Sequence, residues 1–169
     1  MKKLSNEQSK KINQYRKQQK DISELIKGYD IRGLDLSNSI IKTFNRICDN
    51  ISNVNFSYAI IGEDKKETNL GSSIVNNCNF RGTVFKGLVL ARKTDFRYST
   101  FVYAQVPNAE YQGADLRHCT FCNTVIALGT NVGARAKIDK TLIWQLMRVY
   151  ETDFELEYKP KKPKEEDKK

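Results

Sequence analysis

The chain has 169 residues, the length of one ordinary domain, and it needs no second domain to bury a core. No apolar run approaches the length of a membrane span, and the polar residues after Leu4 do not resemble a signal-peptide core, so we expect a cytoplasmic protein that does not bind membranes. The formal net charge of +9 favours acidic partners.

Residues 1–28 carry over half of this excess charge, with eight Lys or Arg against three acidic residues. Ser5 and Gln8 resemble a capping box, and an apolar stripe predicts a helical segment that Gly28 can end. The stripe consists of Ile12, Tyr15, Ile22 and Ile26. We expect a basic N-terminal helical segment that covers one end of the following fold, and its charge leaves nucleic-acid binding open.

Beyond residue 28 the chain repeats every five residues. Twelve successive apolar residues mark the repeat: Leu70, Val75, Phe80, Phe85 and Leu90, then after one extra residue Phe96, Phe101, Val106, Tyr111, Leu116, Phe121 and Ile126. The residue two places earlier is small in all cases except Leu88. The same phase begins upstream, where Arg46 interrupts it, at Ile31, Leu36, Ile41, Ile51, Phe56 and Ile61.

A five-residue period fits neither a helix nor a flat strand, because it scatters apolar residues around a helix and alternates them between strand faces. The chain must therefore bend once per repeat. If four bends close one coil, each segment turns one large and one small side chain inward. We therefore expect an all-β solenoid over residues 29–138, with Phe80, Phe101 and Phe121 stacked in an aromatic ladder.

Four stretches carry the repeat most clearly: Ala114-Asp115-Leu116, Thr68-Asn69-Leu70, Cys78-Asn79-Phe80 and Thr94-Asp95-Phe96. They resemble the A(D/N)Lxx unit of pentapeptide-repeat proteins. The resemblance implies a right-handed quadrilateral β-helix, often with helical caps and often dimeric through a terminal helix.

Residues 62–67 interrupt the repeat with a polar bulge, and a basic stretch follows it on the outside of the predicted solenoid. In gyrase-binding members of the resembled family, projecting loops contribute to function. The candidate partner contacts are therefore Glu63, Asp64, Lys65, Lys66, Arg81, Lys86, Arg92 and Lys93. Asp95-Phe96-Arg97 and Asp115-Leu116-Arg117 are expected to stack as a mixed-charge ladder, which weakens a nucleic-acid groove here.

His118, Cys119 and Cys122 could bind a metal, but the chain has no other histidine and no second cysteine pair of similar spacing. Cys78 and Cys119 should lie two coils apart, at roughly 9.6 Å, beyond the roughly 7 Å that a disulfide spans between Cα atoms. We expect reduced thiols, no metal and no cofactor. One histidine provides no evident nucleophile and base, so we expect no enzyme activity.

Residues 139–152 predict a second, C-terminal capping helix, which is a candidate dimer interface through Leu142, Leu146 and Tyr150. Residues 153–169 have few apolar residues and many charges, so a disordered tail is expected.

The preferred function is a non-enzymatic scaffold that binds another macromolecule, above all a protein. The family resemblance also suggests a topoisomerase-interacting DNA mimic. The charge of this chain argues against DNA mimicry, because mimicry needs an acidic rod and residues 29–138 carry thirteen Lys or Arg against nine acidic residues. Nucleic-acid binding through residues 1–28 is the other alternative.

Overall fold

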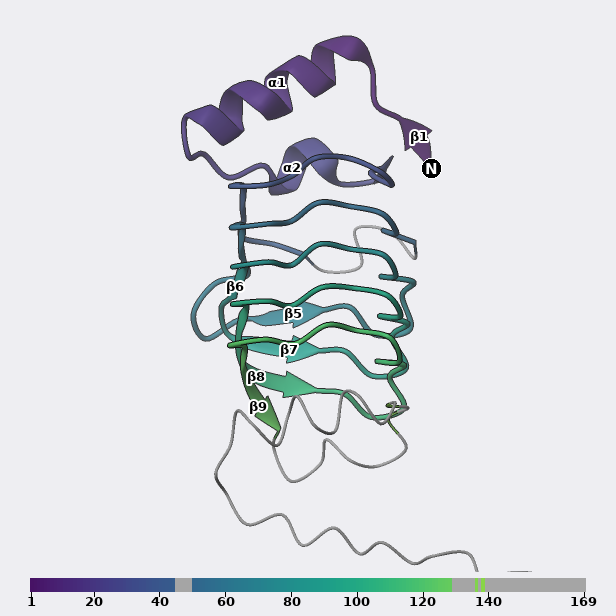
Figure 1. Cartoon of the computed structure of the whole chain (residues 1–169). Helices are drawn as coiled ribbons and strands as arrows, with labels where there is room; N and C mark the ends of the chain where they lie inside the picture. Colours follow the sequence, from purple (N-terminus) through teal and green to yellow (C-terminus); the bar gives the residue numbers. More distant parts are fainter. Residues whose placement is uncertain (45–49, 129–135, 137, 139–169) are drawn as a thin grey trace, which may run out of the picture.

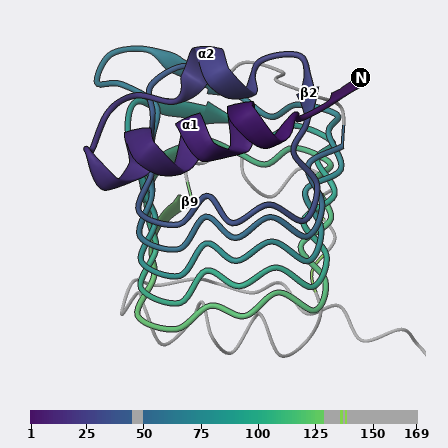
Figure 2. The ribbon, with the colours of Figure 1, turned by 90° about the horizontal axis from the view of Figure 1, so that it is seen from above.

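A computed structural model describes residues 1–44, 50–128, 136 and 138 of the chain. In it the chain forms a parallel β-solenoid, with coils stacked along one axis (Figure 1) and superimposed when seen from above (Figure 2). Most segments are short: β3 Ile40–Ile41, β4 Ile60–Ile61, β5 Glu67–Asn69, β6 Val84–Phe85, β7 Leu88–Leu90, β8 Gln105–Glu110 and β9 Val125–Leu128. They pair in parallel in one sheet.

Parallel bridges fix the length of each coil. One column of bridged residues runs through Asp35, Asn55, Asn79, Thr100 and Thr120. The steps from 35 to 55 and from 100 to 120 are twenty residues, whereas 55 to 79 is longer by four and 79 to 100 by one. The basic coil therefore has twenty residues, and the longer coils contain insertions that leave this column in register.

The interior of the coils is filled by the residues that the five-residue period predicts. Phe80 stacks on Phe101, and Phe101 on Phe121, each at 4.9 Å between ring centroids, which confirms the aromatic ladder. Phe56 extends it by a further stacked ring, 5.3 Å from Phe80. Stacked rings at this spacing combine burial of large apolar surfaces with favourable ring contacts.

Some of the small inward residues also form hydrogen bonds between neighbouring coils. Thr83 donates its hydroxyl to the Phe56 carbonyl at 2.7 Å, and Thr94 donates to the Leu70 carbonyl at 2.8 Å. In each pair the acceptor is the large inward residue of the neighbouring coil. Because a buried hydroxyl without a partner is costly, such hydrogen bonds favour Ser and Thr at inward sites. Ser39 and Thr68 are exceptions, since their buried hydroxyls have no hydrogen-bond partner among the described residues.

The predicted position of the single inserted residue is wrong. We placed it between Leu90 and Phe96, but Val89 and Ala91 are buried while Leu88 and Leu90 are half-buried on the outside. The extra residue comes earlier, at the bend after Phe85. In the run Leu88 to Ala91 every residue is apolar, so hydrophobicity alone cannot identify the inward ones. This shift also explains why Leu88 broke the small-residue pattern, since Val89 occupies that site.

The N-terminal segment folds as two helices and two short strands. These are β1 Lys2–Lys3, α1 Asn6–Lys17, α2 Ser23–Ile26 and β2 Tyr29–Asp30. The predicted capping box is confirmed: the Gln8 amide donates to the Ser5 hydroxyl, and the Ser5 amide donates to the Gln8 side chain. The apolar stripe is split between α1 and α2, because the chain leaves the helix at Gln18 and takes a positive φ at Gln19.

α1 lies across one end of the solenoid (Figures 1 and 2). Ile12 is buried against the core, and Ile22 and Ile26 join it. Arg16 fixes the helix to the first coil, donating to the Ser37 carbonyl at 2.9 Å and to the Asp35 carbonyl at 2.7 Å.

Among the described residues, none of the helices is long and apolar enough to cross a membrane. The predicted C-terminal helix and tail, including Leu142, Leu146 and Tyr150, lie outside the described residues.

Candidate interaction surfaces

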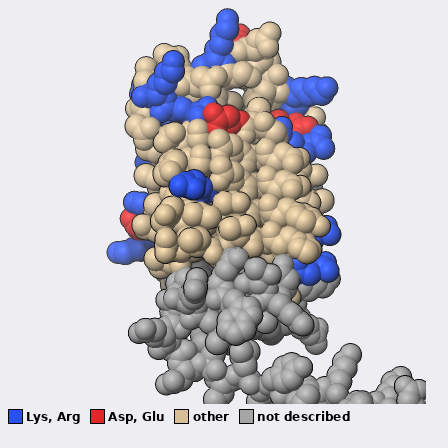
Figure 3. Space-filling view, in the orientation of Figure 1, with Lys and Arg blue, Asp and Glu red and all other residues tan. Residues whose placement is uncertain are grey.

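The N-terminal end of the molecule has a basic surface. Exposed lysines without an acidic partner among the described residues project from α1 and the turn after it: Lys10, Lys11, Lys17 and Lys20. Figure 3 shows Lys and Arg gathered over these elements. Arg16, by contrast, pairs with Asp35 at 3.1 Å. The surface can therefore attract anions through its lysines while α1 stays fixed by Arg16.

Five of the predicted partner contacts come together at the loop between β4 and β5. Glu63 pairs with Lys66 and lies 3.8 Å from Lys42, and Asp64 lies 3.4 Å from Lys86. The hydrogen bond from Lys66 lowers the pKa of the Glu63 carboxyl. Lys65 is exposed at the tip of the loop. Since the acids are paired within the cluster, Lys65 is the residue best placed to meet a partner.

Two glycines fit this loop closely against the next coil. Gly62 has φ +90°, and a Cβ atom there would lie 2.5 Å from the Lys86 carbonyl oxygen. Gly87 has φ +69°, and a Cβ atom there would collide with the Lys66 carbonyl oxygen. Glycine is required at both positions for the backbone conformation and for the close approach. The loop is thus held by backbone packing as well as by ion pairs.

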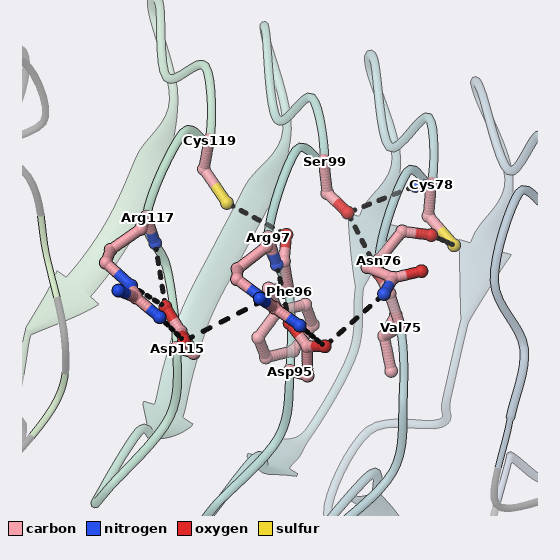
Figure 4. Close-up of polar contacts among 10 residues, drawn as sticks. All are labelled: Val75, Asn76, Cys78, Asp95, Phe96, Arg97, Ser99, Asp115, Arg117 and Cys119. Atoms are coloured by element: carbon pink, nitrogen blue, oxygen red, sulfur yellow. Dashed lines mark hydrogen bonds and ion pairs between the residues drawn. The ribbon is translucent and has the colours of Figure 1, made fainter.

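The predicted mixed-charge ladder is confirmed (Figure 4). Arg97 lies 2.9 Å from Asp95 and 3.9 Å from Asp115, and Arg117 lies 2.7 Å from Asp115. Hydrogen bonds from Arg97 and Arg117 lower the pKa of Asp95 and Asp115, respectively. These charges neutralise one another, so the ladder has little net charge with which to attract a phosphate or an acidic protein.

Arg92 and Lys93 lie elsewhere, along a groove of about 640 Å³ on the side of the solenoid that carries β5 and β7. Arg92 pairs with Glu110 at 2.6 Å across this groove. Leu88 and Leu90 line it as half-buried apolar side chains. The sequence analysis missed these two leucines because it assigned Leu90 to the interior and Leu88 to a disrupted inward site.

Arg81 lies apart from the loop between β4 and β5 and from the groove that contains Arg92 and Lys93. Its Nε donates to the Tyr58 hydroxyl at 3.3 Å, and its guanidinium lies 5.3 Å from the centre of the Tyr103 ring. Neither tyrosine was among the predicted contacts. The sequence could have indicated them, because each tyrosine follows an inward phenylalanine by two residues and lies outside the predicted core.

The cysteines and the histidine occupy different environments. Cys78 and Cys119 are buried and point inward, and burial raises the pKa of the Cys78 thiol to about 12. Cys122 is exposed. His118 stacks on Tyr98, with 4.9 Å between ring centroids. Within residues 1–44 and 50–128, no three side chains of His, Cys, Asp or Glu converge as metal ligands.

The coil geometry and these outward surfaces define a parallel β-solenoid whose polar chemistry lies on its exterior. No protein-family model matches the chain, and no curated protein matches its sequence. Among solved structures, the chain is similar to trypsin-treated QnrB1, a plasmid-mediated fluoroquinolone resistance protein. The two are 18% identical, the match covers 72% of this chain and 83% of that chain, and the TM-score is 0.19. A likeness at this level carries no information about function.

Proposed function

We propose that this protein is a pentapeptide-repeat solenoid with right-handed, four-sided coils that acts, without catalysis, as a scaffold binding a protein partner. In this proposal residues 29–138 form the scaffold, residues 1–28 and 139–152 cover its ends, and residues 153–169 form a charged tail. It would act in the cytoplasm and need no cofactor.

One observation supports this proposal above the others: in the coils that the structure describes, packed side chains fill the inside of the solenoid. Large inward residues such as Phe56, Phe80 and Phe96 are almost completely buried. The inward hydroxyls of Thr83, Thr94 and Ser99 donate hydrogen bonds to neighbouring coils. Binding is therefore expected on the outer faces, which are extended and held rigid by the stacked coils. Rigid surfaces of this kind suit recognition, because little conformational entropy is lost on binding.

Site-specific photo-crosslinking tests the proposal. A photoreactive phenylalanine analogue would replace Lys65, Leu88 or Val102 in turn, so that three outward surfaces are sampled in the full chain. We expect a discrete protein adduct, in cells of the protein's source, from at least one position and not from all three. Adducts with nucleic acid alone, or equal diffuse labelling from all positions, would contradict a protein-binding scaffold.

Nucleic-acid binding through the N-terminal end is the second candidate, favoured by the lysines of α1, which pair with no acidic side chain of the described residues. Anisotropy of labelled double-stranded DNA, at about 50 and 200 mM salt, tests it because phosphate contacts weaken steeply with salt. Combining Lys10→Gln, Lys11→Gln and Lys17→Gln should then abolish binding, whereas Lys65→Gln should not. Salt-insensitive binding, or binding unchanged in the triple variant, would reject this candidate.

A topoisomerase-directed role follows only from the family resemblance, and the basic excess of residues 29–138 speaks against DNA mimicry. A gyrase supercoiling assay with the purified chain would detect it.

A further inference from the structure

One face of the solenoid collects exposed aromatic residues. Tyr58, Tyr98 and Tyr103 are 55%, 56% and 49% exposed, and His118 is exposed beside Tyr98. Together with Arg81, these four residues are called the tyrosine face. They stand at the bends before and after the segments whose inward residues are Phe56, Phe80, Phe101 and Phe121. The face therefore spans the outer side of the aromatic ladder.

The backbone at these bends makes the aromatic residues unexpected. Tyr58, Tyr98, Tyr103 and His118 all have φ between 59° and 63°. Large side chains rarely adopt this left-handed conformation, which costs roughly 1–2 kcal/mol and which Gly and Asn adopt more easily. Other bends in the same two columns do use Asn or Gly: Gly33, Asn38, Asn53, Asn77, Gly82 and Asn123.

The third column of such bends, on the far side of the coils, contains Ser72, Lys93 and Gly113. It carries no aromatic residue. Strained positions that persist in a fold are found preferentially at functional sites. The concentration of rings on the two columns that flank one face therefore indicates a use for that face.

Arg81 supplies the face with its charge. Its Nε is held by the Tyr58 hydroxyl and its guanidinium plane by the Tyr103 ring, a cation–π contact. Among the described residues no acidic side chain pairs with Arg81. Its two terminal nitrogens thus stay available, in a fixed orientation, for a planar acceptor such as a carboxylate.

Around Arg81, the outward residues between the two columns of bends carry no charge, and Asp35, in the first coil of the same column, is paired with Arg16. Asn55, Asn79, Thr100 and Thr120 form one column of the bridged residues, and Val102 and Cys122 lie beside them. Figure 3 shows a broad surface over the coils with few charged groups. Removing water from such an uncharged surface around Arg81 costs little free energy.

We propose that the tyrosine face docks an acidic segment of a partner protein, with an Asp or Glu carboxylate bound by Arg81 and flanking apolar groups against Tyr58 and Tyr103. This inference rests on the proposed scaffold function and specifies the surface and the chemistry of its partner. Tyrosine and arginine are the residue types that contribute most at protein interfaces, particularly where neighbouring groups exclude water.

The ring geometry favours a protein segment over the bases of a nucleic acid. Tyr98 and His118 already stack on each other, and the Tyr103 ring is contacted by Arg81. The Tyr58 ring lies over Gly82, where an added Cβ atom would be 2.6 Å from the ring. Each ring thus has a face in use, which reduces what is left for stacking bases. Ring edges stay available to a polypeptide, and the Tyr58 hydroxyl, which accepts from Arg81, can still donate.

The test uses selection of phage-displayed random dodecapeptides on the immobilised full chain, followed by affinity measurement of the selected peptides. Four variants of the full chain are compared with the wild type: Arg81→Gln, Arg81→Lys, Tyr103→Ala and Arg92→Gln. The last is the matched control, since Arg92 is an exposed arginine already paired with Glu110. Thermal melting verifies that every variant is folded.

We expect the selected peptides to be rich in Asp or Glu and to bind Arg81→Gln and Tyr103→Ala on the order of 10-fold more weakly or worse. Arg81→Lys should recover only part of the affinity, because an ammonium cannot form the paired contact. Arg92→Gln should bind like the wild type.

Peptides that bind all variants equally would overturn the tyrosine face but leave the scaffold function standing, since another surface would then be in use. Peptides without acidic residues that still need Tyr103 would overturn the assigned partner chemistry. A selection without any binder would count against the face and the scaffold function together.

Discussion

The Ser99 hydroxyl accepts a 3.1 Å hydrogen bond from the Cys78 amide in the neighbouring coil. It also donates a 2.8 Å hydrogen bond to the Val75 carbonyl, so one small side chain joins two backbone groups of the preceding coil (Figure 4). Ser99→Ala would leave both groups without this partner in a buried site. We expect a loss of about 1–3 kcal/mol in the free energy of unfolding, measured by urea denaturation.

Thr120→Ala is the control for this experiment, because Thr120 is exposed and its change should stay within about 0.5 kcal/mol. Equal effects of the two substitutions would show that the cross-coil hydrogen bonds contribute little.

A substitution in the middle of the aromatic ladder should strongly destabilise the fold. Phe101→Ala removes the ring that contacts both Phe80 and Phe121, and the rigid coils can close the resulting cavity only in part. We expect a destabilisation of about 3–5 kcal/mol in urea unfolding. Val102→Ala, next in the chain but on the outside, should cost far less; a similar cost would mean that strand propensity and not core packing dominates.

Substitutions at Gly87 and Gly113 distinguish the stability cost of backbone strain from that of steric collision. Both have positive φ, +69° and +67°, but only at Gly87 would a Cβ atom collide with a backbone carbonyl. Gly113→Ala should cost roughly 1–2 kcal/mol from the left-handed conformation alone, and Gly87→Ala should cost clearly more. Urea unfolding of both variants measures the difference, and equal losses would contradict the close contact between the loop and the coil.

The charge ladder predicts a loss of stability in acid. Arg97 and Arg117 hold the pKa of Asp95 and Asp115 below the ordinary value, so these carboxylates stabilise the fold above that value. The stabilisation should be lost as the pH falls below about 4 and through the lowered pKa values. Unfolding curves between pH 7 and pH 3 measure the slope, which should be shallower in Asp115→Asn and in Arg117→Gln. An unchanged slope in both variants would contradict the ladder's contribution.

Thiol reactivity checks the placement of the cysteines. In a Cys48→Ser background, which removes the cysteine outside the described residues, one equivalent of thiol should react rapidly with a disulfide reagent in the folded protein. That thiol is Cys122, because Cys78 and Cys119 are buried and a thiol with a raised pKa is rarely ionised. All three should react in urea. If Cys122→Ser keeps the rapid phase, an inward cysteine is exposed in solution.

The sequence predicted the interior of this solenoid better than its exterior. Inward positions follow a fixed period, so Phe80, Phe101 and Phe121 could be placed on one ladder. The contact between Arg97 and Asp115 likewise follows from the twenty-residue coil. The period fails where neighbouring residues are all apolar, as between Leu88 and Ala91. There the choice of inward residue depends on the bend at Gly87, which the pattern does not contain.

The tyrosine face shows why the surface was harder to predict. Tyr58 and Arg81 are 23 residues apart, and they meet because they follow the stacked residues Phe56 and Phe80 on neighbouring coils, the four extra residues between them leaving the register unchanged. The predicted contacts were chosen for charge, so they included Arg81 but neither of the tyrosines that hold it. A pattern of large residues at positions where the bend favours Gly or Asn would have been the better signal.

The bend between β4 and β5 has a consequence for engineering. The passage from Ile61 to Leu70 takes four residues more than the repeat requires, the passage from Phe85 to Ala91 takes one more, and β8 makes the same turn without any addition. Pairing on both sides is preserved in each case. This bend is therefore a natural grafting point, where a foreign peptide epitope could replace residues 63–66 and be displayed on a rigid support without moving any inward side chain.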